Sequence, residues 1–251
     1  MSVAELASYI DYSVLKPEFT EQEIIDLTKD GAALGCATIC INPAYIELCE
    51  PYVRGTITKL CPVTDFPFGD SSTESRVAQI NIVGKYDCVG EIDIVANFGK
   101  LRSGKYDEVT ADLKACADAA HALGHELKVI LETDALNEEQ IRQGCECIIA
   151  AGADYIKTST GFLTGHEAKG ATVDMIAMIM DQNKGRAKIK GSGCIRTREH
   201  FLQLIDMVSV NMADENIVAP FNVIHCITGF EPLIQPASFS RQHRVDENMF
   251  A

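Results

Sequence analysis

The chain has 251 residues, of which 47% are hydrophobic and 23% are charged, and its formal net charge at pH 7 is −14. This composition is typical of a soluble globular protein, and the length suits one α/β barrel or two smaller domains. The acidic charge, without any cluster of lysines and arginines, excludes nucleic acid as an expected partner, and no apolar run of about 18 residues predicts a membrane span.

Short apolar, β-prone segments alternate with longer helical patterns along the chain. The strand segments are YIDYSVL (9–15), ATICI (37–41), TITKLCPV (56–63), EIDIVAN (91–97), ELKVILE (126–132), DYIKTS (154–159) and AKIKGS (187–192). An eighth strand is expected within residues 206–228, where MVSV (207–210) and FNVIHCIT (221–228) are the two candidates. Such alternation is typical of consecutive βα units.

The helical segments carry start and stop signals. Thr20 and Glu23 form a capping-box pattern at the start of the first long helix, which is expected to end near Gly35. A later helix is expected to end at Gly124, and another to begin after Asn137. The apolar stripes of these two later helices are Val109, Leu113, Cys116 and Ala120, and Ile141, Cys145, Ile148 and Ile149.

Eight strands with intervening helices and no linker predict a single-domain (β/α)8 TIM barrel over residues 1–230. A doubly wound open sheet is the alternative fold, but no G-x-G-x-x-G turn follows the first strand. Residues 231–251 are expected to form an irregular C-terminal extension, because prolines precede a polar tail there.

The ten cysteines are not spaced as metal ligands or as a disulfide framework. Cys36-x3-Cys40 and Cys145-x-Cys147 are not C-x2-C pairs, and the six histidines are dispersed. We therefore expect reduced thiols, no metal and no cofactor. The N-terminal residues lack a basic segment followed by an apolar one, so no secretory signal is predicted and a cytoplasmic location is expected.

Charged residues interrupt three of the predicted strands on one face. Side chains at positions i and i+2 of a strand share a face, which places Lys157 with Tyr155, and Asp93 with Glu91. Lys157 and Lys190 lie late in neighbouring strands, at the end of a barrel where active sites form. Two lysines in a partly desolvated pocket favour a neutral amine, which can attack a carbonyl carbon and form a Schiff base. Asp93 could then exchange protons with the second lysine and with water.

An ion-pair cluster without chemistry is the competing interpretation of these residues. A lysine at a strand end is more often solvated or paired, and Lys188 is expected to form such a pair lower in its strand. Asp93 is equally suited to a salt bridge. From the residues alone, both interpretations stay open.

Six segments resemble the deoxyribose-phosphate aldolase family, in the order in which that family has them. They are IDYSVLKPEFTEQEI (10–24), CATICINPAYI (36–46), CPVTDFPFGDSSTESRV (61–77), EIDIVANFGKLRSGKYDEV (91–109), YIKTSTGF (155–162) and KIKGSGCIRT (188–197). The resemblance implies a TIM barrel and a cofactor-free class I aldolase, a lyase. Such enzymes reversibly cleave 2-deoxy-D-ribose 5-phosphate to glyceraldehyde 3-phosphate and acetaldehyde.

The resemblance also implies roles for particular residues. Lys157 matches the Schiff-base lysine, Lys190 the lysine that perturbs it, and Asp93 the aspartate of the proton relay. The positions that match residues lining or supporting the substrate pocket are Asp11, Lys16, Cys40, Asn42, Thr160, Gly161, Gly193 and Arg196.

The sequence departs from the family where phosphate is expected to bind. The family's second glycine after strand seven is Cys194 here, and its glycine and paired serines after strand eight are missing, with Thr228-Gly229 as a distant substitute. Three functions follow: an aldolase for the phosphorylated sugar, a related lysine aldolase for a different or unphosphorylated aldehyde, and a non-catalytic barrel. Barrels of this size frequently pair, so a homodimer is one candidate assembly, although the sequence identifies no interface.

Overall fold

The structure, a computed structural model, describes residues 2–211 and 225–226, so residues 231–251 and Thr228-Gly229 lie outside the described residues. Its strands are parallel and neighbour one another in the order β7-β6-β5-β4-β3-β2-β1-β8. They are β1 (Asp11–Val14), β2 (Thr38–Ile41), β3 (Lys59–Thr64), β4 (Glu91–Val95), β5 (Glu126–Ile130), β6 (Tyr155–Lys157), β7 (Lys188–Lys190) and β8 (His225–Cys226). From β1 to β7 this is chain order, which excludes a doubly wound sheet.

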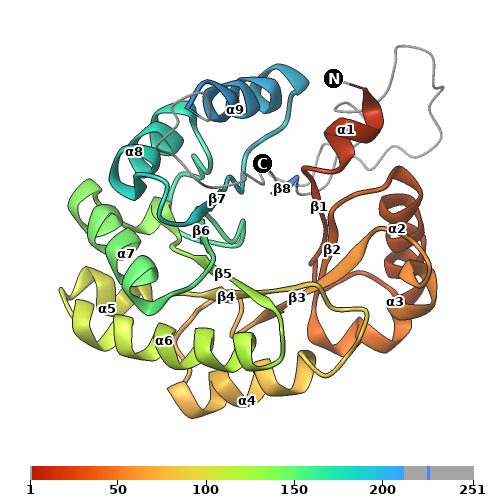
Figure 1. Cartoon of the computed structure of the whole chain (residues 1–251), viewed down its shortest axis with the longest axis horizontal. Helices are drawn as coiled ribbons and strands as arrows, with labels where there is room; N and C mark the ends of the chain where they lie inside the picture. The colour runs from red at the N-terminus through yellow and green to blue at the C-terminus, as the bar shows by residue number, and fades with distance from the viewer. Residues whose placement is uncertain (1, 212–224, 227–251) are drawn as a thin grey trace.

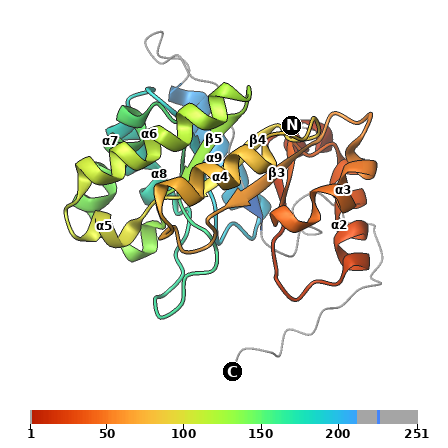
Figure 2. The same cartoon turned by 90° about the horizontal axis from the view of Figure 1, so that it is seen from below.

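The sheet curves around a central axis, and the helices lie outside it (Figure 1). The helices are α1 (Val3–Ala7), α2 (Glu21–Leu34), α3 (Ile46–Val53), α4 (Thr73–Val83), α5 (Phe98–Arg102), α6 (Tyr106–Ala122), α7 (Glu138–Ala151), α8 (Val173–Asn183) and α9 (Arg198–Asn211). Seen from below, α2 and α3 cover one side of the molecule and α7 and α8 the opposite side (Figure 2). No described helix combines the length and hydropathy that crossing a bilayer requires.

The seven strands predicted before residue 206 are all present, and each lies within its predicted segment except β3, which runs one residue further, to Thr64. For the eighth strand, the candidate MVSV is wrong, because these residues belong to α9. Phe201, Leu204 and Ile205 of α9 are buried at helical spacing and direct this segment against the sheet. Within FNVIHCIT, His225 and Cys226 pair in parallel with Asp11 and Tyr12.

The predicted helix signals are confirmed. Thr20 accepts a hydrogen bond from the Glu23 amide at 3.3 Å while Glu23 accepts one from the Thr20 amide at 2.7 Å, and α2 ends at Gly35, whose φ is 74°. Asn137 forms the same reciprocal pair with Gln140 at the start of α7. These caps fix the residues at which the helices begin and end, and they therefore limit where the neighbouring strands can end.

The two faces of the sheet differ in chemistry. Side chains directed outward, including Ile39, Ile92, Val129 and Ile156, join the helices in one apolar core. The residues that alternate with them point inward and are mostly polar or charged. Packing against the helices therefore fixes the strand register, and the register holds charged groups in the interior.

Candidate active site

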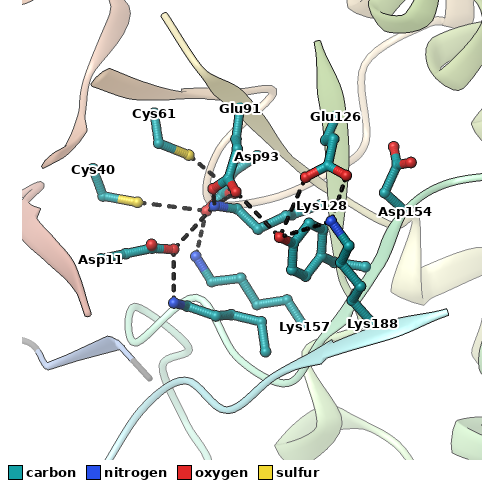
Figure 3. Close-up of polar contacts among 12 residues, drawn as sticks. Asp11, Cys40, Cys61, Glu91, Asp93, Glu126, Lys128, Asp154, Lys157 and Lys188 are labelled. Atoms are coloured by element: carbon teal, nitrogen blue, oxygen red, sulfur yellow. Dashed lines mark hydrogen bonds and ion pairs between the residues drawn. The ribbon is translucent and has the colours of Figure 1, made fainter. Parts of the chain in front are cut away.

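Lys157, the last residue of β6, points toward Asp93 of β4 across the intervening strand β5 (Figure 3). Its Nζ donates a hydrogen bond to Asp93 Oδ2 in a buried ion pair. The Lys157 side chain is 1% exposed and that of Asp93 is 0% exposed. Asp93 therefore reaches Lys157 from two strands away in the sheet.

A third interior lysine, Lys128 of β5, lies beside this pair. Its Nζ is 3.5 Å from Asp93 Oδ1 and 3.0 Å from Asp11 Oδ2, and it also forms an ion pair with Glu91. Sequence reasoning did not identify Lys128. The available signal was a charged residue between Leu127 and Val129, on the inward face of an apolar strand.

Lys190, the last residue of β7, completes the cluster through Asp11. Its Nζ is 3.1 Å from Asp11 Oδ2, and its side chain is 1% exposed. Lys190 is the sheet partner of Lys157 in the parallel register, so both lysines end their strands at the same height. Lys157 and Lys190 are thus linked through Asp93, Lys128 and Asp11.

The interior cluster is balanced in formal charge. Three lysines, at positions 128, 157 and 190, face three carboxylates, at positions 11, 91 and 93. Burial raises the pKa of Asp93, but the ammonium groups of Lys157 and Lys128 outweigh burial and lower it to about 2. Asp93 is therefore a carboxylate at neutral pH.

The expectation that Lys157 rests as a neutral amine is wrong for this arrangement. Burial lowers its pKa, yet the Asp93 carboxylate outweighs burial and raises the pKa of Lys157 above its usual range. The like charge that opposes this rise is Lys128 and not Lys190, which pairs with Asp11. Lys157 therefore rests as an ammonium group and must pass a proton to become a nucleophile.

Two thiols complete the surroundings of Asp93. Cys40 Sγ lies 3.6 Å from Asp93 Oδ2, and Cys61 Sγ lies 3.2 Å from Oδ1. Burial raises the pKa of the Cys61 thiol well above its usual value, so it donates to Asp93 as a thiol. Cys40, Cys61 and Asp93 are also the one group of described residues whose ligand atoms lie close enough together to hold a metal ion.

A small apolar cluster, separate from the main core, adjoins these thiols. Leu15 and Val63 are buried with Cys40 and Cys61, and partly buried Phe66 and Phe162 pack against them. The two phenyl rings meet edge to face, with centroids 5.3 Å apart. The amine of Lys157 therefore lies near both a charged network and an apolar wall suited to a small carbonyl compound.

At the other end of the interior, Lys188 pairs with Glu126. Tyr155 Oη bonds to Glu91 at 3.2 Å and to Glu126 at 3.3 Å. The predicted ion pair of Lys188, low in its strand, is confirmed. This layer closes the interior below the three-lysine cluster.

Glu132, which follows β5, fixes the loop after Lys157. It is 1% exposed, has a φ of 58°, and accepts hydrogen bonds from the Thr160 hydroxyl and, at 3.3 Å, from the Thr160 amide. The hydroxyl of Thr160, predicted to border the substrate, is thus engaged within the protein. Burial raises the pKa of Glu132.

The raised pKa of Glu132 predicts a pH-dependent effect of Glu132→Gln. A carboxyl with a raised folded-state pKa stabilises the fold below its unfolded pKa, and this contribution is lost as pH rises through the folded value. Stability of the variant relative to the parent should therefore increase between pH 4.5 and 7.5, as measured by urea unfolding. Glu139→Gln, on an exposed position of α7, is the matched control and should show no such trend.

The remaining predicted binding residues lie around this centre rather than in it. Asn42 donates a hydrogen bond to the Leu15 carbonyl at 3.2 Å and so joins the loops after β1 and β2. The ammonium group of Lys16 lies over the Phe19 ring, 5.8 Å from its centroid. The other three are Gly161, with a φ of 81°, Gly193, with a φ of 84°, and exposed Arg196.

A sequence profile of the DeoC/LacD family aldolases matches residues 6–218. The chain belongs to this aldolase family. It is 40% identical to the deoxyribose-phosphate aldolase of Desulfitobacterium hafniense over 206 residues, covering 82% of this chain and 92% of that protein. It is 39% identical to the deoxyribose-phosphate aldolase of Treponema denticola over 195 residues, covering 78% and 88%.

Solved structures agree with this family membership. The aldolase QR15 superposes with a TM-score of 0.74 at 36% identity, covering 80% of this chain and 87% of that one. A putative deoxyribose-phosphate aldolase from Coccidioides immitis gives 0.75 at 31% identity, covering 82% and 79%. The resemblance seen in the sequence is confirmed.

Proposed function

We propose that this family member is a class I aldolase that reversibly cleaves 2-deoxy-D-ribose 5-phosphate to glyceraldehyde 3-phosphate and acetaldehyde, with Lys157 as the Schiff-base lysine. The observation that carries the proposal is the buried contact between the Lys157 amine and the Asp93 carboxylate. It places a nucleophile and a proton acceptor against each other in an interior that excludes water.

The ion pair supplies the proton transfers that Schiff-base formation needs. Lys157 passes its proton to Asp93, and the neutral amine attacks C1 of the open-chain sugar. The carbonyl oxygen takes up protons and leaves as water, which gives a protonated iminium. The electrons of the C2–C3 bond then move into the iminium while the C3 hydroxyl loses its proton. Glyceraldehyde 3-phosphate leaves, and protonation and hydrolysis of the remaining enamine return acetaldehyde and the free amine.

Lys128, Asp11 and Lys190 support this chemistry as positioning residues. Lys128 contacts Asp93 Oδ1, whereas Lys157 contacts Oδ2, and Lys128 lowers the pKa of Lys157 by like charge. Lys190 and Lys128 share the carboxylate of Asp11. The network holds the Asp93 side chain in place while Asp93 gains and loses a proton.

The hydroxyl of Ser159 is suited to a hydrogen bond with the substrate. Its side chain is 3% exposed, and Oγ has no hydrogen-bond partner among the described residues. Ser159 lies two residues beyond Lys157, close to the Gly193 backbone. A buried hydroxyl without a partner is costly unless a ligand supplies one, which suits a hydroxyl or phosphate oxygen of the sugar.

Trapping with borohydride tests the proposal directly. Incubation with acetaldehyde and sodium borohydride should fix a two-carbon adduct on the peptide that holds Lys157, as seen by peptide mass spectrometry. Turnover of 2-deoxyribose 5-phosphate should accompany it. An unmodified Lys157 peptide together with no turnover would instead support a non-catalytic barrel.

A second candidate substrate, an unphosphorylated aldehyde, is favoured by one feature of the loop after β7. Cys194 has a φ of 58°, a conformation that costs a residue with Cβ about 1–2 kcal/mol. Its Sγ lies 3.4 Å from the Ala168 carbonyl oxygen, so the side chain occupies space beside the backbone of Gly193. This is where the resemblance places a phosphate-binding turn.

Cys194→Gly should therefore favour the phosphorylated sugar. Removing the side chain opens the backbone N–H groups after β7 to phosphate, so kcat/KM for 2-deoxyribose 5-phosphate should rise about tenfold, equivalent to 1.4 kcal/mol. Free deoxyribose should be unaffected. Cys194→Ser keeps the bulk and should behave like the parent, and an equal gain on both sugars would contradict a phosphate role for this loop.

We further propose the organisation around this site. Residues 1–230 would form a closed (β/α)8 barrel, with 231–251 as an extension, and two copies would pair as a homodimer in the cytoplasm. Nine cysteines are free thiols among the described residues, which supports a reducing compartment. One similar protein, from Aeropyrum pernix, is described as tetrameric, so sedimentation velocity should decide between dimer and larger assemblies.

A further inference from the structure

The two thiols beside Asp93 have no part in the aldol chemistry described above. Cys40 and Cys61 are sheet partners on β2 and β3, and both are 0% exposed. Together with Asp93 they present three ligand atoms that all lie within 4.8 Å of one another. From this geometry we propose that Cys40, Cys61 and Asp93 bind one thiophilic divalent metal ion, such as Zn²⁺ or Cd²⁺, and that the bound ion inhibits the enzyme.

The spacing of the ligand atoms fits a tetrahedral ion. With Zn–S of about 2.3 Å and Zn–O of about 2.1 Å, tetrahedral angles require S···O separations of about 3.6 Å. The observed S···O distances are 3.6 Å from Cys40 Sγ to Asp93 Oδ2 and 3.2 Å from Cys61 Sγ to Asp93 Oδ1, so each thiol faces its own carboxylate oxygen and an ion would draw both sulfurs toward one carboxylate. The three ligands stand on adjacent strands β2, β3 and β4, so little rearrangement is needed to surround an ion.

The charge balance of the interior allows the ion to enter. The two thiols lose their protons to solvent as two metal–sulfur bonds form, so one doubly charged cation replaces two protons. The net charge of the cluster is unchanged, and no oxidation or reduction is involved. Thiolate ligands select Zn²⁺ and Cd²⁺ over Mg²⁺ and Ca²⁺.

Metal binding and catalysis require the same carboxylate. Asp93 Oδ2 faces both Lys157 and Cys40, so an ion held by Asp93 competes with the Lys157 amine for this oxygen. Lys157 then loses its proton acceptor. Phe66 and Phe162, which are only partly buried, pack against the cysteine cluster.

Cadmium titration of the full chain, after treatment with a chelator, tests the site. Thiolate-to-cadmium absorption and native mass spectrometry should report one Cd²⁺ per chain. Cys61→Ser and Cys40→Ser should each weaken binding about 100-fold or more, since the loss of even an outer-shell partner costs metal sites about 10–100-fold. Two separate variants guard against one of them failing to fold.

Two control thiols separate this site from adventitious binding. Cys116→Ser replaces an equally buried thiol of α6, and Cys194→Ser replaces a partly exposed one. Both should bind Cd²⁺ like the parent. The proposal is overturned if the parent binds no Cd²⁺, if Cys40→Ser and Cys61→Ser bind it normally, or if Cys194→Ser abolishes binding.

The inhibition step rests on the proposed aldolase activity, whereas the binding step does not. Cleavage of 2-deoxyribose 5-phosphate by the parent should fall in proportion to Cd²⁺ occupancy and return on addition of a chelator. Full activity at full occupancy would overturn the inhibition. A chain that binds Cd²⁺ through Cys40 and Cys61 but shows no turnover even without metal would contradict the proposed function and leave the metal site standing.

Discussion

Lys157→Leu is expected to abolish turnover, with a loss of about 10⁴-fold or more in kcat, because the other amine beside Asp93, that of Lys128, stays paired with Asp11 and Glu91. The variant should also form no borohydride-trapped adduct. Leucine removes a buried ammonium group together with its desolvation cost, and Lys128 remains 3.5 Å from Asp93 as a counter-charge. The fold should therefore persist, which far-ultraviolet circular dichroism and a cooperative urea transition will check.

Lys188→Met is the matched control for this experiment. Lys188 is another inward-facing lysine with a carboxylate partner, but it belongs to the lower layer with Glu126 and is 23% exposed. Its variant should still be trapped with acetaldehyde at Lys157. Retention of most turnover by Lys157→Leu, or loss of trapping in Lys188→Met, would place the Schiff base elsewhere.

Lys128→Met is expected to give the largest loss of stability. Its ammonium group holds the carboxylates of Asp11, Glu91 and Asp93 in the interior, and removing one partner of a buried ion pair costs about 3–5 kcal/mol. Burial lowers the pKa of Lys128, but these carboxylates outweigh burial and raise it well above its usual range. The stabilisation is therefore complete at neutral pH and is lost only as pH rises through that raised value.

The same variant should shift the pH dependence of catalysis. Lys128 is the like charge that lowers the pKa of Lys157, so its loss should raise that pKa further and move the pH–kcat profile to higher pH. Lys114→Met controls for an ordinary ion pair, because Lys114 and Asp118 are exposed on α6, and it should cost less than about 1 kcal/mol.

A double-mutant cycle separates charge from packing. Lys128→Met combined with Glu91→Gln removes one lysine and one carboxylate, so it should recover part of the stability lost in the single variant. Urea unfolding of the four proteins gives the coupling energy. A strictly additive result would mean that Lys128 stabilises the interior through its methylene chain rather than through its charge.

The strand faces and the position of Lys157 could be predicted because they depend on local pattern. Alternation along EIDIV and DYIKT sets which side chains point inward, and parallel strands bring their ends to one side. Helix caps such as Thr20 and Glu23 act over three residues and are equally readable. These features need no knowledge of contacts between distant segments.

The partners of each charge could not be predicted in the same way. Whether Lys157 rests as an amine or an ammonium depends on which group its amine contacts, and Lys157 pairs with Asp93 whereas Lys190 pairs with Asp11. Lys128 was missed because its role depends on Asp11, which lies 117 residues away in the chain. The segment MVSV was ambiguous because a short apolar run fits a strand or a helix, and burial of Phe201 and Leu204 decides for the helix.

The order of the interior charges along the chain has a consequence for fragments of the protein. The carboxylates at positions 11, 91 and 93 belong to β1 and β4, whereas the lysines at positions 128, 157 and 190 belong to β5, β6 and β7. Cleavage of the chain between β4 and β5 would give an N-terminal fragment whose interior carboxylates have lost their lysine partners. The C-terminal fragment would hold the three lysines without these carboxylates. Neither piece could close on its own, but each would attract its complement, so the enzyme is built from two mutually dependent halves.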